Sequence, residues 1–132
     1  MNQKPVAIGL LLCEQVIIEE KTRNVTPVNC FTRRRCGGSP LELFPFVALA
    51  FLTDGLGDIP LELRIERLDT FEAVFRRVFS YRFSDPLQTI RCIVRVRDFA
   101  FPEPGEYQLS LLTEDETLAQ CKLVILEKEK LT

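Results

Sequence analysis

The residues with the clearest potential for binding chemistry lie in one short run, Arg33–Cys36, which is followed by two glycines. Arginine presents a planar fork of N–H donors that fits phosphate or carboxylate, and glycine lets backbone N–H groups approach a ligand. The run therefore predicts binding of an anion or an acidic partner. The candidate residues are Arg33, Arg34 and Arg35. No Lys-Ser or Lys-Thr pair follows the glycines, so the P-loop pattern is not met. Alternatively, the arginines face solvent or pair with Asp98 and Glu103.

Cys36 is a candidate nucleophile because neighbouring arginines favour its thiolate form. The chain contains no histidine, and histidine is the commonest general base and a frequent metal ligand. Catalytic pairs of Ser or Cys with His, and metal sites that include His, are therefore excluded within this chain. We expect a protein that is not an enzyme and holds no cofactor, with Cys36 catalysis as the remaining enzymatic alternative.

The five cysteines are an odd number and include no CxxC pair, which disfavours a four-cysteine zinc site and a secreted disulfide framework. Cys13, Cys92 and Cys121 alternate with apolar neighbours and are expected to be small buried residues. The apolar run 6–13 resembles a lipoprotein signal, but it is short and has Leu12 where a small residue is expected, so we interpret it as a strand. No run approaches the roughly 20 apolar residues of a membrane span. These features predict reduced thiols, a cytoplasmic protein and no membrane association.

A second candidate site consists of carboxylates in predicted turns. If successive strands run antiparallel, Asp54, Asp58 and Asp85 fall at one end of the molecule. Ca²⁺ takes roughly six to eight oxygen ligands, which acidic loops can supply. A calcium- or lipid-responsive domain is therefore the alternative function, with these residues as weak metal-ligand candidates. Solvated turns explain the same residues, because Asp is common in turns.

The elements that must position these residues are strands. Alternation of apolar and polar residues is clearest from Ile59 to Glu66. Residues 71–83 fit a helical stripe as well as a strand, and their aromatic and β-branched content favours the strand. Residues 33–44 form the longest segment without a pattern, so we expect a partner-facing loop there. The expected strands are residues 5–19, 25–32, 45–53, 59–66, 71–83, 90–97, 105–112 and 118–126.

A Gly-x-Tyr motif, Gly105 to Tyr107, opens a late strand. This motif is typical of a tyrosine corner, in which the phenol bonds back to nearby backbone, so both residues are predicted to be structural. The strand pattern predicts one all-β domain over residues 1–132, a two-sheet antiparallel sandwich of immunoglobulin-like type with about seven to eight strands. The cysteine and tryptophan of true immunoglobulin domains are absent, since the chain has no Trp and Leu109 stands where the cysteine is expected.

Three motifs are similar to those of a known family: Leu11-Leu12-Cys13, Phe44-Pro45-Phe46 and the segment 101–107. Across most of its length the chain resembles a family of small uncharacterised bacterial proteins with an immunoglobulin-like sandwich. These motifs are mostly structural, so the resemblance implies the fold and no function. The arginine run is not part of the family pattern.

Arg91, Arg95 and Arg97 alternate with apolar residues and predict an arginine-lined strand face. Nucleic-acid platforms add exposed aromatic residues, and the net charge of the chain is −2. Cross-strand pairing with Glu62 and Glu66 therefore explains these arginines, and nucleic-acid binding is not expected. We expect a non-catalytic protein-interaction or structural module. Its partner is another protein or a second copy, bound through an edge strand or residues 33–44.

Overall fold

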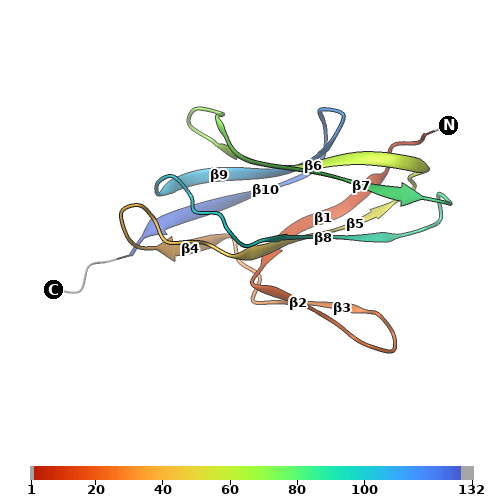
Figure 1. Cartoon of the computed structure of the whole chain (residues 1–132), viewed down its shortest axis with the longest axis horizontal. Coiled ribbons are helices and arrows are strands. Elements are labelled where there is room, and N and C mark those ends of the chain that lie inside the picture. The colour runs from red at the N-terminus through yellow and green to blue at the C-terminus, as the bar shows by residue number, and fades with distance from the viewer. Residues whose placement is uncertain (1, 129–132) are drawn as a thin grey trace.

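The computed structural model describes residues 2–128, and within them it contains ten β-strands and no helix (Figure 1). The all-β prediction is confirmed, and residues 71–83 contain a strand as expected. Ten strands exceed the seven to eight predicted. The strands are β1 (Val6–Cys13), β2 (Gln15–Ile18), β3 (Val25–Val28), β4 (Arg33–Cys36), β5 (Phe46–Thr53), β6 (Gly57–Arg67), β7 (Ala73–Phe83), β8 (Ile90–Val96), β9 (Gly105–Thr113) and β10 (Glu116–Glu127).

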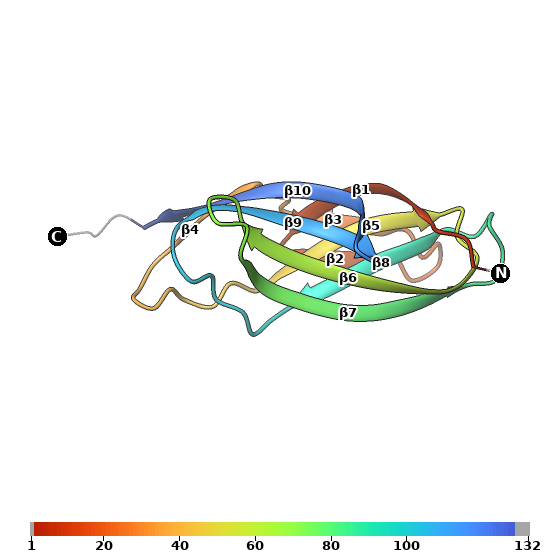
Figure 2. The same ribbon diagram turned by 90° about the horizontal axis from the view of Figure 1, so that it is seen from above.

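The strands form three sheets, whereas two were predicted. One sheet has the order β1-β5-β8, the second has the order β4-β10-β9-β6-β7, and β2 and β3 form a separate hairpin. Figures 1 and 2 show the two larger sheets lying over one another and the hairpin projecting from the side of the three-stranded sheet. Inward-facing side chains of both larger sheets make one core, for example Ala48 and Val94 from the smaller sheet and Leu63 and Leu109 from the larger.

The first predicted strand, residues 5–19, is in fact two strands in different sheets. The chain bends at Glu14, whose N–H donates to the carbonyl of Val28 at 3.0 Å and so starts the hairpin. Gly9 has a φ of 68°, and the register between β1 and β5 shifts between Ile8 and Leu11. One extra residue is accommodated there, as in a β-bulge. Because of this shift, Ile8 and Leu11 lie on the same face, which uninterrupted alternation does not predict.

The prediction of an irregular segment over residues 33–44 is wrong for its first four residues. They form β4, which pairs in parallel with the end of β10 from Val124 to Glu127. Three consecutive arginines conceal the polar–apolar alternation of a strand, and the pairing depends on a segment about 90 residues further along. The remaining residues of the segment, 37–44, are turn and loop as predicted.

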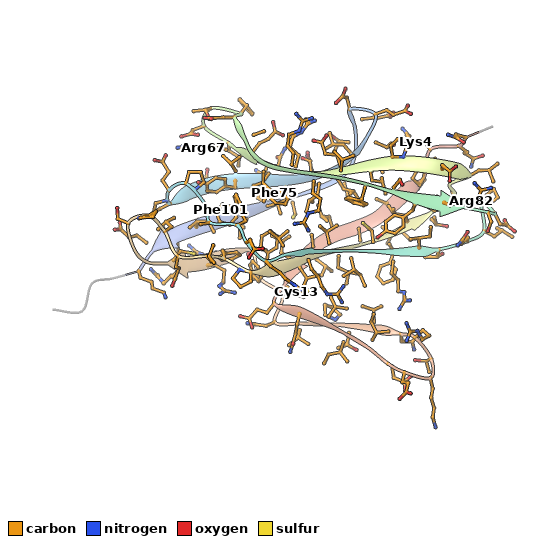
Figure 3. All side chains as sticks on the ribbon, in the orientation of Figure 1. Lys4, Cys13, Arg67, Phe75, Arg82 and Phe101 are labelled. Atoms are coloured by element: carbon orange, nitrogen blue, oxygen red, sulfur yellow. The ribbon has the colours of Figure 1, made fainter. Side chains whose placement is uncertain are left out.

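An aromatic cluster fills the end of the core near the β8–β9 connection. The ring centre of Phe101 lies 4.7 Å from the ring centre of Tyr107 and 5.4 Å from that of Phe44. Figure 3 shows Phe101 and Phe75 directed into the space between the larger sheets. The Tyr107 hydroxyl donates to the carbonyl of Glu103 at 2.6 Å, which is the hydrogen bond expected of a tyrosine corner.

Gly105 precedes this tyrosine with a φ of 152°, in the region that favours glycine. Among residues 2–128 there is no helix with the length and apolar character needed to cross a membrane.

Candidate functional site

The three arginines of β4 do not act as one group. Because side chains alternate along a strand, Arg34 points to the opposite face from Arg33 and Arg35. Its guanidinium centre lies 4.7 Å from the ring centre of Phe44 and 5.3 Å from that of Phe31. Its Nη1 also donates to Oε1 of Glu14 at 3.1 Å. Arg34 therefore stacks on the aromatic cluster and holds the bend between β1 and β2.

Arg33 and Arg35 are exposed on the other face of β4. In the described part of the chain neither forms an ion pair, and Arg35 makes only a long 3.5 Å contact with the carbonyl of Glu127. The predicted partner Glu103 instead forms an ion pair with Arg67. The structure thus brings together two of the three predicted anion-binding residues, Arg33 and Arg35, on the exposed face of β4.

Cys36 does not have the surroundings of a catalytic thiol. Its side chain is 2% exposed and belongs to the core. Burial raises the pKa of the Cys36 thiol, and the nearby carboxylate of Glu42 raises it further, against the smaller opposing effect of Arg34. The expected thiolate is therefore disfavoured, because desolvation outweighs the arginine. All five cysteines are free thiols, and Cys30 is the exposed one.

Two of the three candidate calcium ligands have carboxylates that bond to other groups. Both carboxylate oxygens of Asp58 accept from Nη1 of Arg82, at 3.2 and 3.3 Å. Oδ1 of Asp85 accepts from the N–H of Leu87 at 2.9 Å, as in an Asx turn. The N–H of Asp54 donates to the carbonyl of Pro86 at 3.0 Å, so the two loops do meet at one end of the molecule. Within residues 2–128 no cluster of three or more Cys, Asp or Glu side chains is arranged to hold a metal ion.

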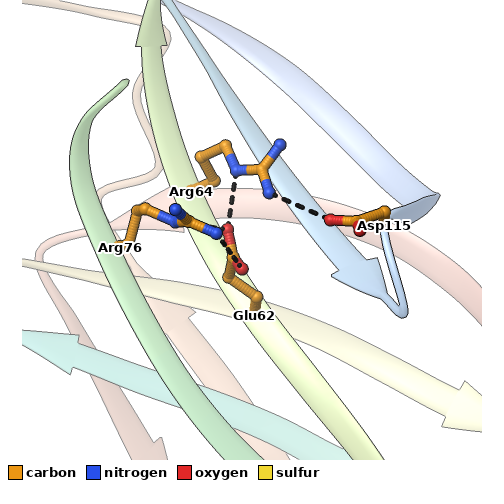
Figure 4. Close-up of polar contacts among 4 residues, drawn as sticks. All are labelled: Glu62, Arg64, Arg76 and Asp115. Atoms are coloured by element: carbon orange, nitrogen blue, oxygen red, sulfur yellow. Dashed lines mark hydrogen bonds and ion pairs between the residues drawn. The ribbon is translucent and has the colours of Figure 1, made fainter. Parts of the chain in front are cut away.

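A charged network that the sequence did not predict lies on the outer face of the five-stranded sheet (Figure 4). Glu62 is at its centre. Its Oε2 accepts from Nε of Arg64 at 2.6 Å, and its Oε1 accepts from Nη2 of Arg76 at 3.0 Å. Arg64 also reaches Asp115 in the β9–β10 turn, with Nη2 and Oδ1 3.5 Å apart.

The network is electrically balanced and partly shielded from water. The hydrogen bonds from Arg76, together with those from Arg64, hold the pKa of Glu62 below its usual range against the effect of burial. Two arginines are matched by two carboxylates, so the network fixes β6 against β7 and leaves no net charge for an anion.

The predicted pairing of Glu62 and Glu66 with the arginines of the 90–97 strand is wrong. β8 belongs to the three-stranded sheet, whereas β6 belongs to the five-stranded sheet. Arg91 instead donates from Nη1 to the carbonyl of Arg23 at 2.6 Å, which ties the tip of the β2–β3 hairpin to β8. Arg95 remains exposed and makes no ion pair within residues 2–128. The alternation of apolar and polar residues correctly placed these arginines on one face of the strand. It could not predict which strand lies beside them.

The outer face of the three-stranded sheet is apolar over β1 and the middle of β5, whereas β8 carries Arg91 and Arg95 on that face. Leu49 in its middle strand is buried, partly beneath the hairpin, and Phe51 beside it is half-buried. On the edge strand β1 the same face carries Val6, Ile8 and Leu11, which are 53%, 59% and 38% exposed. A row of large apolar side chains on an edge strand is the kind of surface that marks a protein contact.

Comparison of the sequence with known protein families finds no family that matches the chain, and a search of curated proteins finds no similar sequence. The resemblance to bacterial immunoglobulin-like proteins therefore stays an expectation from the motifs. Function has to be argued from the residues and surfaces described above.

Proposed function

We propose that this chain is a non-catalytic protein-interaction module built on an immunoglobulin-like two-sheet sandwich. With the β2–β3 hairpin and the short parallel strand β4 set aside, the strand orders β1-β5-β8 and β10-β9-β6-β7 match an A-B-E sheet facing a G-F-C-C′ sheet. The tyrosine corner in β9, which takes the place of strand F, supports the same assignment. On this interpretation the hairpin is an insertion after the first strand.

The observation that carries the interaction function is the exposed apolar row on β1. Val6, Ile8 and Leu11 together place a continuous apolar strip beside the half-buried Phe51. Burying one such side chain fully stabilises a protein or a complex by about 1.5–3 kcal/mol. The fold leaves this burial incomplete, most of all for Val6 and Ile8. β1 is also an edge strand of its sheet, and although its Leu12 carbonyl accepts from the N–H of Phe31, another strand can pair with its earlier residues. We infer that a partner protein covers this strip.

The expected partner chemistry follows from the strip. Its side chains are aliphatic, and no charged residue of β1 interrupts them. A partner therefore presents an apolar surface, or an extended apolar segment that adds to the edge of β1. The exposed Arg33 and Arg35 are a second, polar contact on the opposite sheet, available to an acidic partner.

Affinity purification from cells that naturally express the protein tests the proposal. Ile8→Glu places a charge in the strip, and Leu87→Glu is the matched control at an exposed apolar residue in the β7–β8 loop. We expect Ile8→Glu to lose the proteins captured by the wild-type chain, Leu87→Glu to retain them, and both variants to unfold at the wild-type temperature. Retention of the same proteins by Ile8→Glu would rule out the β1 strip as the interaction surface.

A further inference from the structure

The turn between β6 and β7 carries an exposed aromatic residue in a conformation that does not suit it. Phe71 is 71% exposed and has a φ of 58°. Its N–H donates to the carbonyl of Arg67 at 2.8 Å, and the N–H of Arg67 donates to the carbonyl of Glu72 at 3.0 Å, so backbone hydrogen bonds fix this turn. Left-handed backbone is disfavoured for any residue with a Cβ, and glycine or asparagine adopts it more easily. Neither the backbone conformation nor the exposed ring of Phe71 therefore stabilises the folded chain.

Acidic residues flank this ring. Asp69 forms an ion pair with Arg67 at 3.3 Å. Glu72 is exposed and makes no ion pair with any residue of the described range 2–128. The β6–β7 turn thus presents a projecting aromatic side chain beside an unneutralised carboxylate. It stands out from the body of the molecule at one end of β7 (Figure 1).

A groove of complementary character runs between β7 and β8. It has a volume of about 330 Å³, which is enough for a phenyl ring, and its apolar lining includes Phe79, Tyr81 and Ile93. The rings of Phe79 and Tyr81 meet edge to face with centres 5.7 Å apart. An aromatic ring that enters the groove can continue this edge-to-face packing.

The rim of the groove is basic. Arg77 and Arg95 line it, and neither forms an ion pair within the described part of the chain. Arg77 donates from Nη1 to the carbonyl of Arg95 at 2.6 Å, which fixes its guanidinium across the seam between the two sheets. The side chain of Arg95 is exposed and free to meet an incoming carboxylate.

We propose that Phe71 of one copy inserts into the β7–β8 groove of a second copy, with Glu72 against Arg95, to form a two-fold symmetric dimer. Phe71 lies in the turn that leads into β7, and Phe79 of the groove lies on β7 itself, eight residues further along, or at most about 26 Å at roughly 3.3 Å per residue. Two copies with antiparallel β7 strands therefore place each ring at the other copy's groove at the same time. Because each copy then contributes both a ring and a groove, the assembly stops at two copies and leaves no ring or groove without a partner.

The dimer surface is separate from the β1 strip of the proposed function. β1 and β8 are the two opposite edges of the three-stranded sheet. Figure 2 shows β7 as the outermost strand of the five-stranded sheet, where a second copy has access to it. The inference goes beyond the proposed function and does not depend on it.

Sedimentation velocity over a range from micromolar to millimolar protein tests the dimer. We expect the wild-type chain to dimerise with increasing concentration. Phe71→Asn removes the ring but suits left-handed backbone, so it should weaken association about tenfold or more while leaving the unfolding temperature equal or higher. The matched control is Leu87→Asn, at another exposed apolar turn residue, and it should dimerise as the wild type does.

Charge reversal tests the orientation. Glu72→Arg and Arg95→Glu should each weaken the dimer, and the double variant should restore much of the affinity because the pair is reformed with opposite signs. A wild-type chain that stays monomeric at millimolar concentration would overturn the proposal. So would a dimer that Phe71→Asn leaves unchanged, or a double variant no tighter than the weaker single variant. Ile8→Glu should leave the dimer intact, so failure here is distinguishable from failure of the β1 strip.

Discussion

Arg34 is predicted to stabilise the fold, in contrast to its two neighbours in β4. In Arg34→Ala the stacking on Phe44 and Phe31, at 4.7 and 5.3 Å from the ring centres, is lost. A cation–π contact at a partly exposed site stabilises by about 0.5–1 kcal/mol. The ion pair with Glu14 adds about 0.2–1 kcal/mol, since both side chains are more than a third open to solvent. The expected loss in the free energy of unfolding is therefore about 1–2 kcal/mol.

Urea unfolding followed by circular dichroism measures this loss. For a chain of 132 residues this loss corresponds to a fall in unfolding temperature of about 3–10 °C. Arg33→Ala and Arg35→Ala are the matched controls, and each should change the stability by less than about 0.5 kcal/mol. Arg34→Lys keeps the charge but not the planar stacking, so it should lie between the wild type and Arg34→Ala.

Equal losses in the three alanine variants would refute this reasoning, because they would show that position in the strand does not separate Arg34 from its neighbours. An Arg34→Ala variant as stable as the wild type would refute it as well. All three arginines would then act as solvent-exposed residues, which is the alternative that the sequence allows. Wild-type stability in Arg34→Lys would show that charge alone matters and that stacking contributes nothing.

Three further predictions concern single side chains. Tyr107→Phe keeps the ring but removes the 2.6 Å hydrogen bond to backbone, so we expect a loss of about 1–2 kcal/mol in urea unfolding. Glu62→Gln should destabilise by about 1–2 kcal/mol at neutral pH. Because the folded-state pKa of Glu62 is lowered, this difference should persist above the unfolded value of about 4.3 and disappear as the pH falls through the folded-state pKa; a constant difference down to acid pH would contradict it. Cys36 is buried with a raised pKa and Cys30 is exposed, so mass spectrometry after brief thiol labelling at neutral pH should find modified Cys30 and unmodified Cys36.

The parts of the fold that depend on local alternation could be predicted from the sequence. Ile59, Leu61, Leu63 and Ile65 all enter the core from β6, as their spacing indicates. Aromatic and β-branched residues correctly favoured a strand over residues 71–83. The hydrogen bond of Tyr107 was foreseeable because a Gly-x-Tyr motif uses backbone only four residues away. Each of these features depends only on residues that lie within about a dozen positions of one another in the chain.

What could not be predicted depends on pairing between distant segments. The arginine run has no alternation of its own and becomes a strand only because the edge of β10 is open beside it. The partner of Glu62 is Arg76 because β6 and β7 share a register that no single-strand pattern contains. The bend at Glu14 has no neighbouring glycine or proline from which it could be predicted. It is stabilised by a backbone hydrogen bond to Val28 of β3. These contacts join residues far apart in the chain, and local sequence patterns do not determine the register in which such segments pair.

The two proposed surfaces differ in the kind of partner they permit, and together they define how the module would work. The β1 strip is aliphatic and lies on an edge strand, so it suits binding through buried apolar area, with affinity that salt changes little. The Phe71 turn and the β7–β8 groove combine an aromatic ring with opposite charges, so the dimer should weaken as salt screens Glu72 from Arg95. Because the β1 strip and the β8 side of the groove lie at opposite edges of the three-stranded sheet, a two-fold dimer leaves both β1 strips open. A partner with two apolar segments would then bind more tightly to the dimer than to the Phe71→Asn monomer, through effective concentration alone.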